Sequence, residues 1–160
     1  MSIFYCSHET PIGQLLLMGH ETALTQISFP GTWKEEDIDD CILDKSNFTQ
    51  VTTQLDEYFC GKRQKFNVPL DLRGTPFQKQ VWQQLSSIPY GTTTNYAEIA
   101  KSINNPKGCR AVGLANGKNP IPIIIPCHRV IGKDGTLTGF GGGLDIKQQL
   151  LNLERKVLYS

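Results

Sequence analysis

The sequence predicts an α+β fold in two parts, a small α+β unit over residues 1–72 and a mainly helical unit over residues 73–160. Three observations predict it. Apolar and polar residues alternate in the first part, apolar residues recur at helical spacing in the second, and the net charge changes sign between them. With 160 residues and 39% hydrophobic content, the chain can bury one good core or two small ones.

In the first part, alternation over Ile12 to Leu17 and Leu24 to Phe29, with a break at Gly19, predicts a pair of strands. A helix ended by Gly61 is expected to follow, because apolar residues recur at intervals of three and four; they are Val51, Leu55, Tyr58 and Phe59. Nothing here has catalytic spacing, and the expected role of this part is a scaffold.

The second part predicts short helices in quick succession. Pro76 suits a first helical turn, and the apolar face of this helix is Phe77, Val81, Trp82, Leu85 and Ile88. Asn95 is expected to cap a second helix, with Glu98 three residues on, and a third helix runs from Gly108 to Asn116-Gly117. Helix, short turn and helix is the pattern of a helix-turn-helix unit.

The charge is distributed unevenly, although the whole chain carries only +1. Residues 1–72 hold five basic and eleven acidic side chains, whereas residues 73–160 hold eleven basic and four acidic ones, so the halves carry −6 and +7. A positive half favours a polyanionic partner such as nucleic acid. Electrostatic attraction between the two parts explains the asymmetry equally well.

The third predicted helix is rich in small residues, namely Ala111, Gly113 and Ala115, with Arg110 near its start and Lys118 just after it. Small side chains let a helix approach a DNA groove closely, but they do not reach the base edges that long polar side chains read. Tight packing between helices in a core is the alternative interpretation of the same residues.

The hexapeptide Ile125-Pro126-Cys127-His128-Arg129-Val130 contains the chain's best candidate nucleophile. Only a thiolate attacks efficiently, and the adjacent His128 and Arg129 are expected to lower the pKa of Cys127 from its usual ~8.5. A buried structural cysteine is the alternative interpretation.

The five cysteines are odd in number, scattered and without a Cys-x-x-Cys pair, which argues against a disulfide framework and a zinc knuckle. No stretch approaches the ~18 apolar residues of a membrane span, and the first 18 residues do not have the pattern of a signal peptide. A reducing, intracellular location is therefore expected, without a membrane.

The second half resembles the O6-alkylguanine-DNA alkyltransferase family. The resemblance is carried by Arg110-Ala111-Val112-Gly113, Asn119-Pro120, the Cys127 hexapeptide, Gly142-Gly143-Leu144 and Glu154. It implies a ribonuclease H-like N-terminal domain and a winged helix-turn-helix domain that binds DNA and carries the active site. It also implies repair of double-stranded DNA containing O6-alkylguanine and, less favourably, O4-alkylthymine, by one irreversible transfer to Cys127. No cofactor is expected, and the protein is expected to be cytoplasmic and monomeric, with cooperative assembly on DNA left open.

The resemblance also assigns catalytic roles. Cys127 would accept the alkyl group, His128 would be the base and Glu154 would orient His128. If residues 127 and 128 lie on an extended strand, their side chains point to opposite faces, so a water would bridge them. Glu154 is expected at the edge of an apolar stripe on a helix from Asp145; the stripe comprises Ile146, Leu150, Leu153 and Val157.

Other positions are implied for recognition. Arg110 would fill the space of a flipped nucleotide, Tyr96 would turn its phosphate, and Asn119 would tie two tight turns under the active-site loop. Residues 139–143 would form a lid in which Phe140 stacks on the base and the Gly141 N–H reaches O6. The residues Arg129, Val130 and Gly142 are assigned to base or DNA binding with them.

Two departures from the family stand out. Phe140 replaces a common tyrosine, which keeps stacking and loses a hydroxyl. His20 and Thr25 occupy two positions where some relatives bind zinc, with only Cys6 remaining, so no metal is expected.

Three other functions were weighed. A thiol hydrolase would leave the positive half unexplained, and a transcription regulator would need no thiolate and would prefer one DNA sequence. Non-catalytic lesion binders of the family lack the cysteine, which is present here as Cys127.

Overall fold

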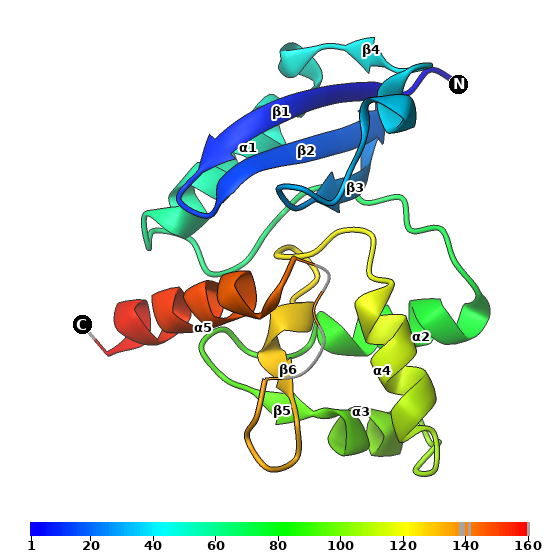
Figure 1. Cartoon of the computed structure of the whole chain (residues 1–160), viewed down its shortest axis with the longest axis vertical. Coiled ribbons are helices and arrows are strands. Elements are labelled where there is room, and N and C mark those ends of the chain that lie inside the picture. The colour runs from blue at the N-terminus through cyan, green and yellow to red at the C-terminus, as the bar shows by residue number, and fades with distance from the viewer. Residues whose placement is uncertain (138–139, 141, 160) are drawn as a thin grey trace. The chain divides into compact units, whose positions relative to one another are not determined.

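The structure is a computed structural model that describes residues 1–137, 140 and 142–159. The chain forms two compact units, Met1–Leu72 and Arg73–Ser160 (Figure 1). Each unit has its own secondary structure.

The first unit is built on a four-stranded sheet. Its strands are β1 (Phe4–Thr10), β2 (Gly13–His20), β3 (Ala23–Ser28) and β4 (Ile42–Leu43), in the spatial order β3-β2-β1-β4. The predicted pairing of the second and third strands is confirmed as antiparallel, whereas β1 was not predicted as a strand. Gly19 does not break β2; the register shifts there instead, and a side chain at this position would collide with the Ala23 carbonyl.

The helix α1 (Thr49–Phe59) belongs to the same unit, where Figure 1 shows it lying along the sheet. It buries Val51, Leu55 and Tyr58, which confirms the predicted helical stripe except at Phe59, which is half-buried. Two short 3-10 turns, η1 (Glu35–Ile38) and η2 (Lys45–Phe48), lie between β3 and α1. Gly61, with φ of +79°, follows the helix end in the left-handed conformation that glycine adopts most readily.

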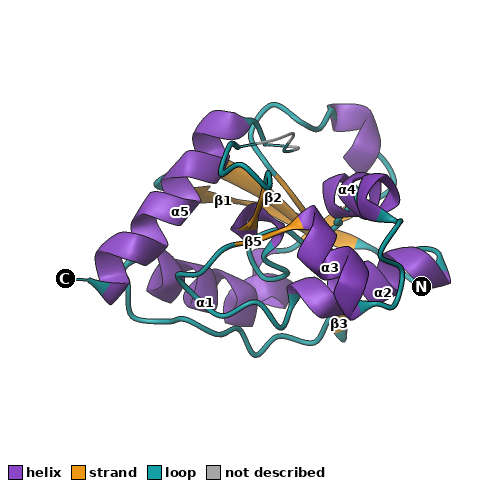
Figure 2. Ribbon diagram, turned by 90° about the horizontal axis from the view of Figure 1, so that it is seen from below, coloured by secondary structure: helices purple, strands orange, loops and turns teal. Residues whose placement is uncertain are grey.

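Over its described residues, the second unit contains four α-helices and a two-stranded parallel sheet. The helices are α2 (Pro76–Leu85), α3 (Tyr96–Ser102), α4 (Cys109–Gly117) and α5 (Leu144–Leu158), and the strands are β5 (Thr94–Asn95) and β6 (Val130–Ile131). Helices α2, α3 and α4 pack on one another, and Figure 2 shows β5 between this group and α5. The mixed α+β class predicted from the sequence is confirmed.

Local sequence explains where these helices begin. Pro76 is at the start of α2, and Thr75 and Gln78 form a reciprocal capping box that sequence inspection missed, with hydrogen bonds of 3.1 and 2.9 Å. The Asn95 side chain accepts a hydrogen bond of 2.9 Å from the Glu98 N–H, which confirms the predicted cap of α3. Helix α2 is shorter than its apolar stripe, because Ile88 is buried beyond the helix end.

Helix α4 has two different faces. Val112 and Ala115 are buried, and the Ala115 carbonyl accepts a hydrogen bond of 2.8 Å from the Trp82 indole. Gly113 faces the Tyr96 ring of α3, so small residues do serve helix packing here. Arg110 and Leu114 are exposed, which leaves the opposite face of the helix open to a partner. No helix in the described ranges is long and apolar enough to cross a lipid bilayer.

Candidate active site

Cys127, His128 and Arg129 lie on a single 3-10 turn, η3, and not on the extended strand expected from the sequence. Backbone hydrogen bonds from Cys127 to Ile125 (2.8 Å) and from Arg129 to Pro126 (3.1 Å) fix this turn. The expectation of alternating side chains was therefore wrong. The turn instead buries all three side chains, with His128 fully inaccessible and Cys127 only 5% exposed.

Asn119 holds the loop that precedes this turn. Its side chain donates to the Ile125 carbonyl at 2.7 Å and accepts from the Ile121 N–H at 3.0 Å. Between these points Ile123 adopts φ of +74°, which is an unusual conformation for a β-branched residue. Such a conformation costs about 1–3 kcal/mol and persists only where the surroundings impose it. Asn119 thus joins the two ends of a strained loop next to Cys127.

Glu154 receives hydrogen bonds from His128, Arg129 and Gly91 inside the protein. Its Oε2 is 2.6 Å from His128 Nε2 and 3.0 Å from Arg129 Nη2, and its Oε1 accepts from Arg129 Nε at 2.8 Å and from the Gly91 N–H at 3.1 Å. Burial alone would raise the pKa of Glu154, but the hydrogen bonds and charges of His128 and Arg129 outweigh it and hold the pKa well below its usual range. The carboxylate is therefore ionised at neutral pH.

The ionised carboxylate determines which tautomer His128 adopts. Because Glu154 can only accept, the proton of neutral His128 must be on Nε2, and Nδ1 keeps its lone pair. Burial lowers the pKa of His128, against the opposing effect of Glu154. Nδ1 is buried and has no hydrogen-bond partner among the described residues. His128 thus presents a basic nitrogen without a proton.

The pKa of Cys127 is not lowered as the sequence predicted. Burial raises the pKa of this thiol to about 11, while a hydrogen bond with Asn119 and the charge of Lys147 act in the opposite direction. The prediction was wrong because the sulfur is desolvated by burial and because His128 Nε2 and the Arg129 guanidinium are bound to Glu154. Cys127 is thus a neutral thiol in the free protein and must lose its proton during the reaction.

The inward face of α5 differs from the predicted stripe. The buried residues are Lys147, Leu150, Leu151 and Glu154, so Glu154 lies on the central line of the buried face and not at its edge. Ile146, Leu153 and Val157 are only half-buried. The predicted face was centred on apolar residues, whereas two charged residues, Lys147 and Glu154, belong to the buried face.

Lys147 was missed by the sequence analysis. Its ammonium group donates to the Val130 carbonyl at 2.6 Å and lies 5.7 Å from the centre of the Phe140 ring. Burial lowers its pKa, and Cys127 opposes that shift. Its spacing of seven residues from Glu154, two helical turns, was the only signal in the sequence.

Arg129 and Val130 differ most from their predicted roles. Arg129 is 6% exposed and its guanidinium is bound to Glu154, so in this structure the side chain faces the protein interior and not the DNA expected from the sequence. Val130 is fully buried, and its carbonyl is already bound by Lys147.

The other predicted recognition residues are accessible to different degrees. Arg110 is exposed on the first turn of α4, and Tyr96, Phe140 and Gly142 are half-buried. Residues 138, 139 and 141 lie outside the described residues, and with them the expected hydrogen bond from Gly141 and part of the expected lid.

Gly91 connects the site to the end of α5. It has φ of +76°, and a side chain there would collide with Leu158. We expect Gly91→Ala to destabilise the protein by more than the about 1–3 kcal/mol that backbone strain alone costs, because the added methyl group would also collide with Leu158 and displace the N–H that binds Glu154. Urea unfolding measures this loss. Gly135→Ala is the matched control, because Gly135 has a similar φ of +86° with nothing within 4 Å. Equal losses for both variants would contradict the proposed contact.

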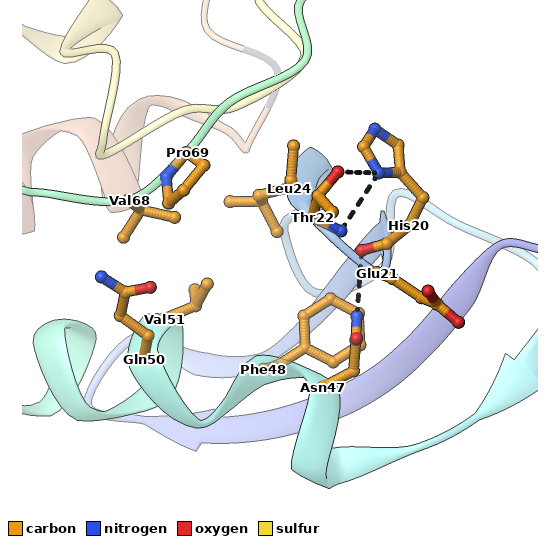
Figure 3. Close-up of a pocket in the computed structure, with 11 residues that line it drawn as sticks. His20, Glu21, Thr22, Leu24, Asn47, Phe48, Gln50, Val51, Val68 and Pro69 are labelled. Carbon is orange, nitrogen blue, oxygen red and sulfur yellow. Dashed lines mark hydrogen bonds between the residues drawn. The ribbon is translucent and has the colours of Figure 1, made fainter.

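The first unit contains a pocket around His20, shown in Figure 3. Leu24, Val51 and Val68 are among its apolar walls, and Asn47 donates to the His20 carbonyl at 3.2 Å. His20 Nδ1 is within hydrogen-bond distance of the Thr22 hydroxyl (3.1 Å), and Nε2 is 3.1 Å from the Asp71 carboxylate.

These residues do not fit a zinc site. Both ring nitrogens of His20 are occupied by protein groups, and Thr25 donates to the Met18 carbonyl at 3.2 Å. Burial raises the pKa of Cys6 to about 11, which disfavours the thiolate that zinc requires. Within the described ranges no group of three or more His, Cys, Asp or Glu side chains could hold a metal ion.

Comparison with known families covers nearly the whole chain. Residues 76–156 match the family described as 6-O-methylguanine DNA methyltransferase, DNA binding domain, and residues 3–72 match its ribonuclease-like domain. The chain belongs to the 6-O-methylguanine DNA methyltransferase family. The resemblance seen in the sequence is therefore confirmed.

Individual members of this family are similar over the full length. A methylated-DNA–protein-cysteine methyltransferase from Methanosarcina acetivorans is 51% identical over 153 residues, which are 95% of this chain and 98% of that protein. The protein of the same name from Mycobacterium tuberculosis is 49% identical and covers 96% of this chain and 93% of its own length. The crystal structure of M. tuberculosis OGT in complex with DNA has a TM-score of 0.91 and 47% identity, covering 96% and 94% of the two chains.

Proposed function

We propose that this methyltransferase repairs double-stranded DNA by moving an alkyl group from O6 of guanine onto its own Cys127, once and irreversibly. The observation that carries the proposal is the buried thiol of Cys127 on the same turn as His128, whose Nε2 is held by Glu154 and whose Nδ1 is available as a base. Family membership and the DNA complex of a 47% identical relative support DNA as the partner. O4-alkylthymine is proposed as a poorer substrate.

The chemistry follows from the protonation states. We propose that His128 Nδ1 takes the thiol proton through a bridging water, as the family resemblance implies, and that Glu154 stabilises the resulting imidazolium. The sulfur then forms a bond with the alkyl carbon as the carbon–O6 bond breaks, and the electron pair moves into the guanine ring. Guanine gains at N1 the equivalent of the proton that Cys127 lost. The reaction is thus balanced without a cofactor.

Irreversibility follows from the product. The alkylated Cys127 is a thioether, whose sulfur carries no proton and is a poor leaving group. His128 therefore cannot restore the free thiol. The protein is therefore consumed by the reaction.

The buried sulfur requires that the damaged base leave the helix. A guanine stacked in duplex DNA cannot bring O6 to a thiol that is 5% exposed, so the nucleotide must flip out at a cost of a few kcal/mol. We place the exposed face of α4 against DNA, with Arg110 in the vacated space and Tyr96 beside the turned phosphate. Phe140 and Gly142 would line the base pocket.

We expect Arg110→Ala to slow repair of duplex DNA roughly tenfold or more, because extrusion costs a few kcal/mol and about 1.4 kcal/mol is a factor of ten. Reaction with the free base O6-benzylguanine should change little, since it needs no extrusion. Single-turnover rates with both substrates measure the difference. Lys118→Ala is the control, because it removes an exposed cation at the other end of α4. Equal slowing with both substrates would argue against an extrusion role.

The two units have different proposed roles. Residues 73–160 form the alkyltransferase domain, since all the proposed site residues are there, and residues 1–72 are the scaffold domain. We further propose that the protein acts in the cytoplasm, where its DNA substrate is accessible, and binds DNA as a monomer, with cooperative assembly left open.

The DNA product tests this function. After incubation with a duplex containing one O6-methylguanine, nucleoside analysis should show one guanine gained for each O6-methylguanine lost, with intact strands. The yield should not exceed one per protein molecule. Release of a free methylated base, or turnover beyond one, would contradict the proposal; a thiol hydrolase would turn over, and a regulator would leave the DNA unchanged.

A further inference from the structure

The guanidinium of Arg129 has no role in the methyl transfer proposed here, although it is buried and hydrogen-bonded to Glu154 and Ile88. Nε and Nη2 donate to the two oxygens of Glu154 at 2.8 and 3.0 Å, and Nη1 donates to the Ile88 carbonyl at 2.8 Å. The Tyr90 ring lies beneath it, 5.5 Å from the guanidinium carbon. A guanidinium held by three hydrogen bonds in this way is fixed in one orientation.

The carboxylate of Glu154 accepts hydrogen bonds from both the Arg129 guanidinium and His128. Its Oε2 faces His128 Nε2 at 2.6 Å and Arg129 Nη2 at 3.0 Å, so the two donors compete for the same oxygen. We propose that Arg129 is a positioning residue that offsets the charge of Glu154 and thereby keeps His128 neutral, with Nδ1 free to accept the Cys127 proton. This inference rests on the proposed function, because it concerns the base of that reaction.

The charges around His128 explain the need for Arg129. Glu154 from α5 is the one anion against the ring among the described residues, and it favours the imidazolium. Arg129 on η3 and Lys147 on α5 are cations that oppose it, and the neighbouring Cys127 is a neutral thiol. Tyr90 faces Glu154 and Arg129 and is likewise uncharged at neutral pH.

Without the guanidinium, Glu154 would interact mainly with His128. An imidazole beside an unshared, buried carboxylate binds a proton more tightly, as in any close pair of opposite charges. A protonated His128 cannot take the proton of Cys127. Arg129 therefore acts on the nucleophile through two intermediate residues and without touching the substrate.

The test compares Arg129→Met with Arg129→Lys in the full-length protein, using single-turnover methyl transfer from duplex DNA between pH 5 and 9. In Arg129→Met we expect the acid limb of the rate profile to move to higher pH by about one unit. The positive charge of Arg129 opposes protonation of His128, so its removal lets His128 bind a proton more readily. The rate should therefore fall about tenfold on the acid side and approach its plateau at high pH. Arg129→Lys keeps the charge, so its acid limb should stay in place even if the plateau falls. Arg155→Met is the control, since Arg155 is exposed on α5 next to Glu154.

A purely structural role predicts a different pattern. An equal loss of rate at every pH in Arg129→Met, with no movement of the acid limb, would overturn the inference while leaving the proposed function intact. Absence of methyl transfer by the unmodified protein would instead overturn the proposed function.

Nuclear magnetic resonance provides a second test that needs no variant of Arg129. The chain contains three histidines, so the ring nitrogens of His128 can be assigned by substituting His8 and His20. In the unmodified protein we expect a neutral His128 with its proton on Nε2 at pH 7. An imidazolium at that pH would overturn the inference even if Arg129→Met fails to fold.

Discussion

Cys127→Ser should lower methyl transfer by at least about a thousandfold, the scale of loss when a nucleophile is removed from a catalytic group of residues. An oxygen at this position is a far weaker nucleophile than sulfur, and its proton is harder to remove. The substitution changes one buried atom for a slightly smaller one, so the fold and the exposed face of α4 should be preserved. Binding to duplex DNA should therefore be retained.

Transfer of a radiolabelled methyl group from O6-methylguanine DNA to protein measures the loss, and fluorescence anisotropy measures binding. Cys60→Ser is the matched control, because Cys60 is an exposed free thiol at the end of α1. Undiminished transfer by Cys127→Ser would remove Cys127 from its proposed role. A parallel loss in Cys60→Ser would point to a different thiol.

Glu154→Ala should cost about 3–5 kcal/mol of unfolding free energy, the range for breaking one partner of a buried ion pair. The buried guanidinium of Arg129 would lose its charged partner, and His128 Nε2 and the Gly91 N–H would lose their acceptor. Methyl transfer should fall as well, because His128 would lose the group that fixes its tautomer.

Urea unfolding followed by tryptophan fluorescence measures this loss. In a Trp33→Phe background the signal comes from Trp82, which is buried in the second unit. Glu98→Ala is the control, since Glu98 forms an exposed pair with Lys101 at 3.6 Å, and such pairs contribute about 0–1 kcal/mol. A loss below 1 kcal/mol in Glu154→Ala would contradict the buried network.

The regular elements were predictable wherever local signals and burial agree. The strands β2 and β3 were located although their burial does not alternate, since Leu15, Leu16 and Leu17 are all buried, and Pro76 and Asn95 marked the starts of two helices. The strand β1 escaped detection because its burial is uneven, with only Cys6 fully buried. The effect of Gly19 was misjudged because a register shift leaves the strand continuous, which depends on the partner strand and not on local propensity.

The site was only partly predictable, for a physical reason. Sequence motifs identified Cys127, His128 and Glu154, but the pKa of Cys127 depends on desolvation and on where neighbouring charges point, which adjacency along the chain does not reveal. Arg129 was assigned to DNA or base binding from the family resemblance, which does not reveal that its guanidinium turns inward to Glu154. Lys147 was overlooked because a lysine on the buried face of a helix contradicts the usual apolar pattern.

The most direct test of the central claim is peptide mapping by mass spectrometry after incubation with duplex DNA that contains one O6-methylguanine. We predict a single added methyl group, stoichiometric with the repaired lesion and located on Cys127. A methyl group on another residue, or a repaired duplex beside an unmodified protein, would contradict the account.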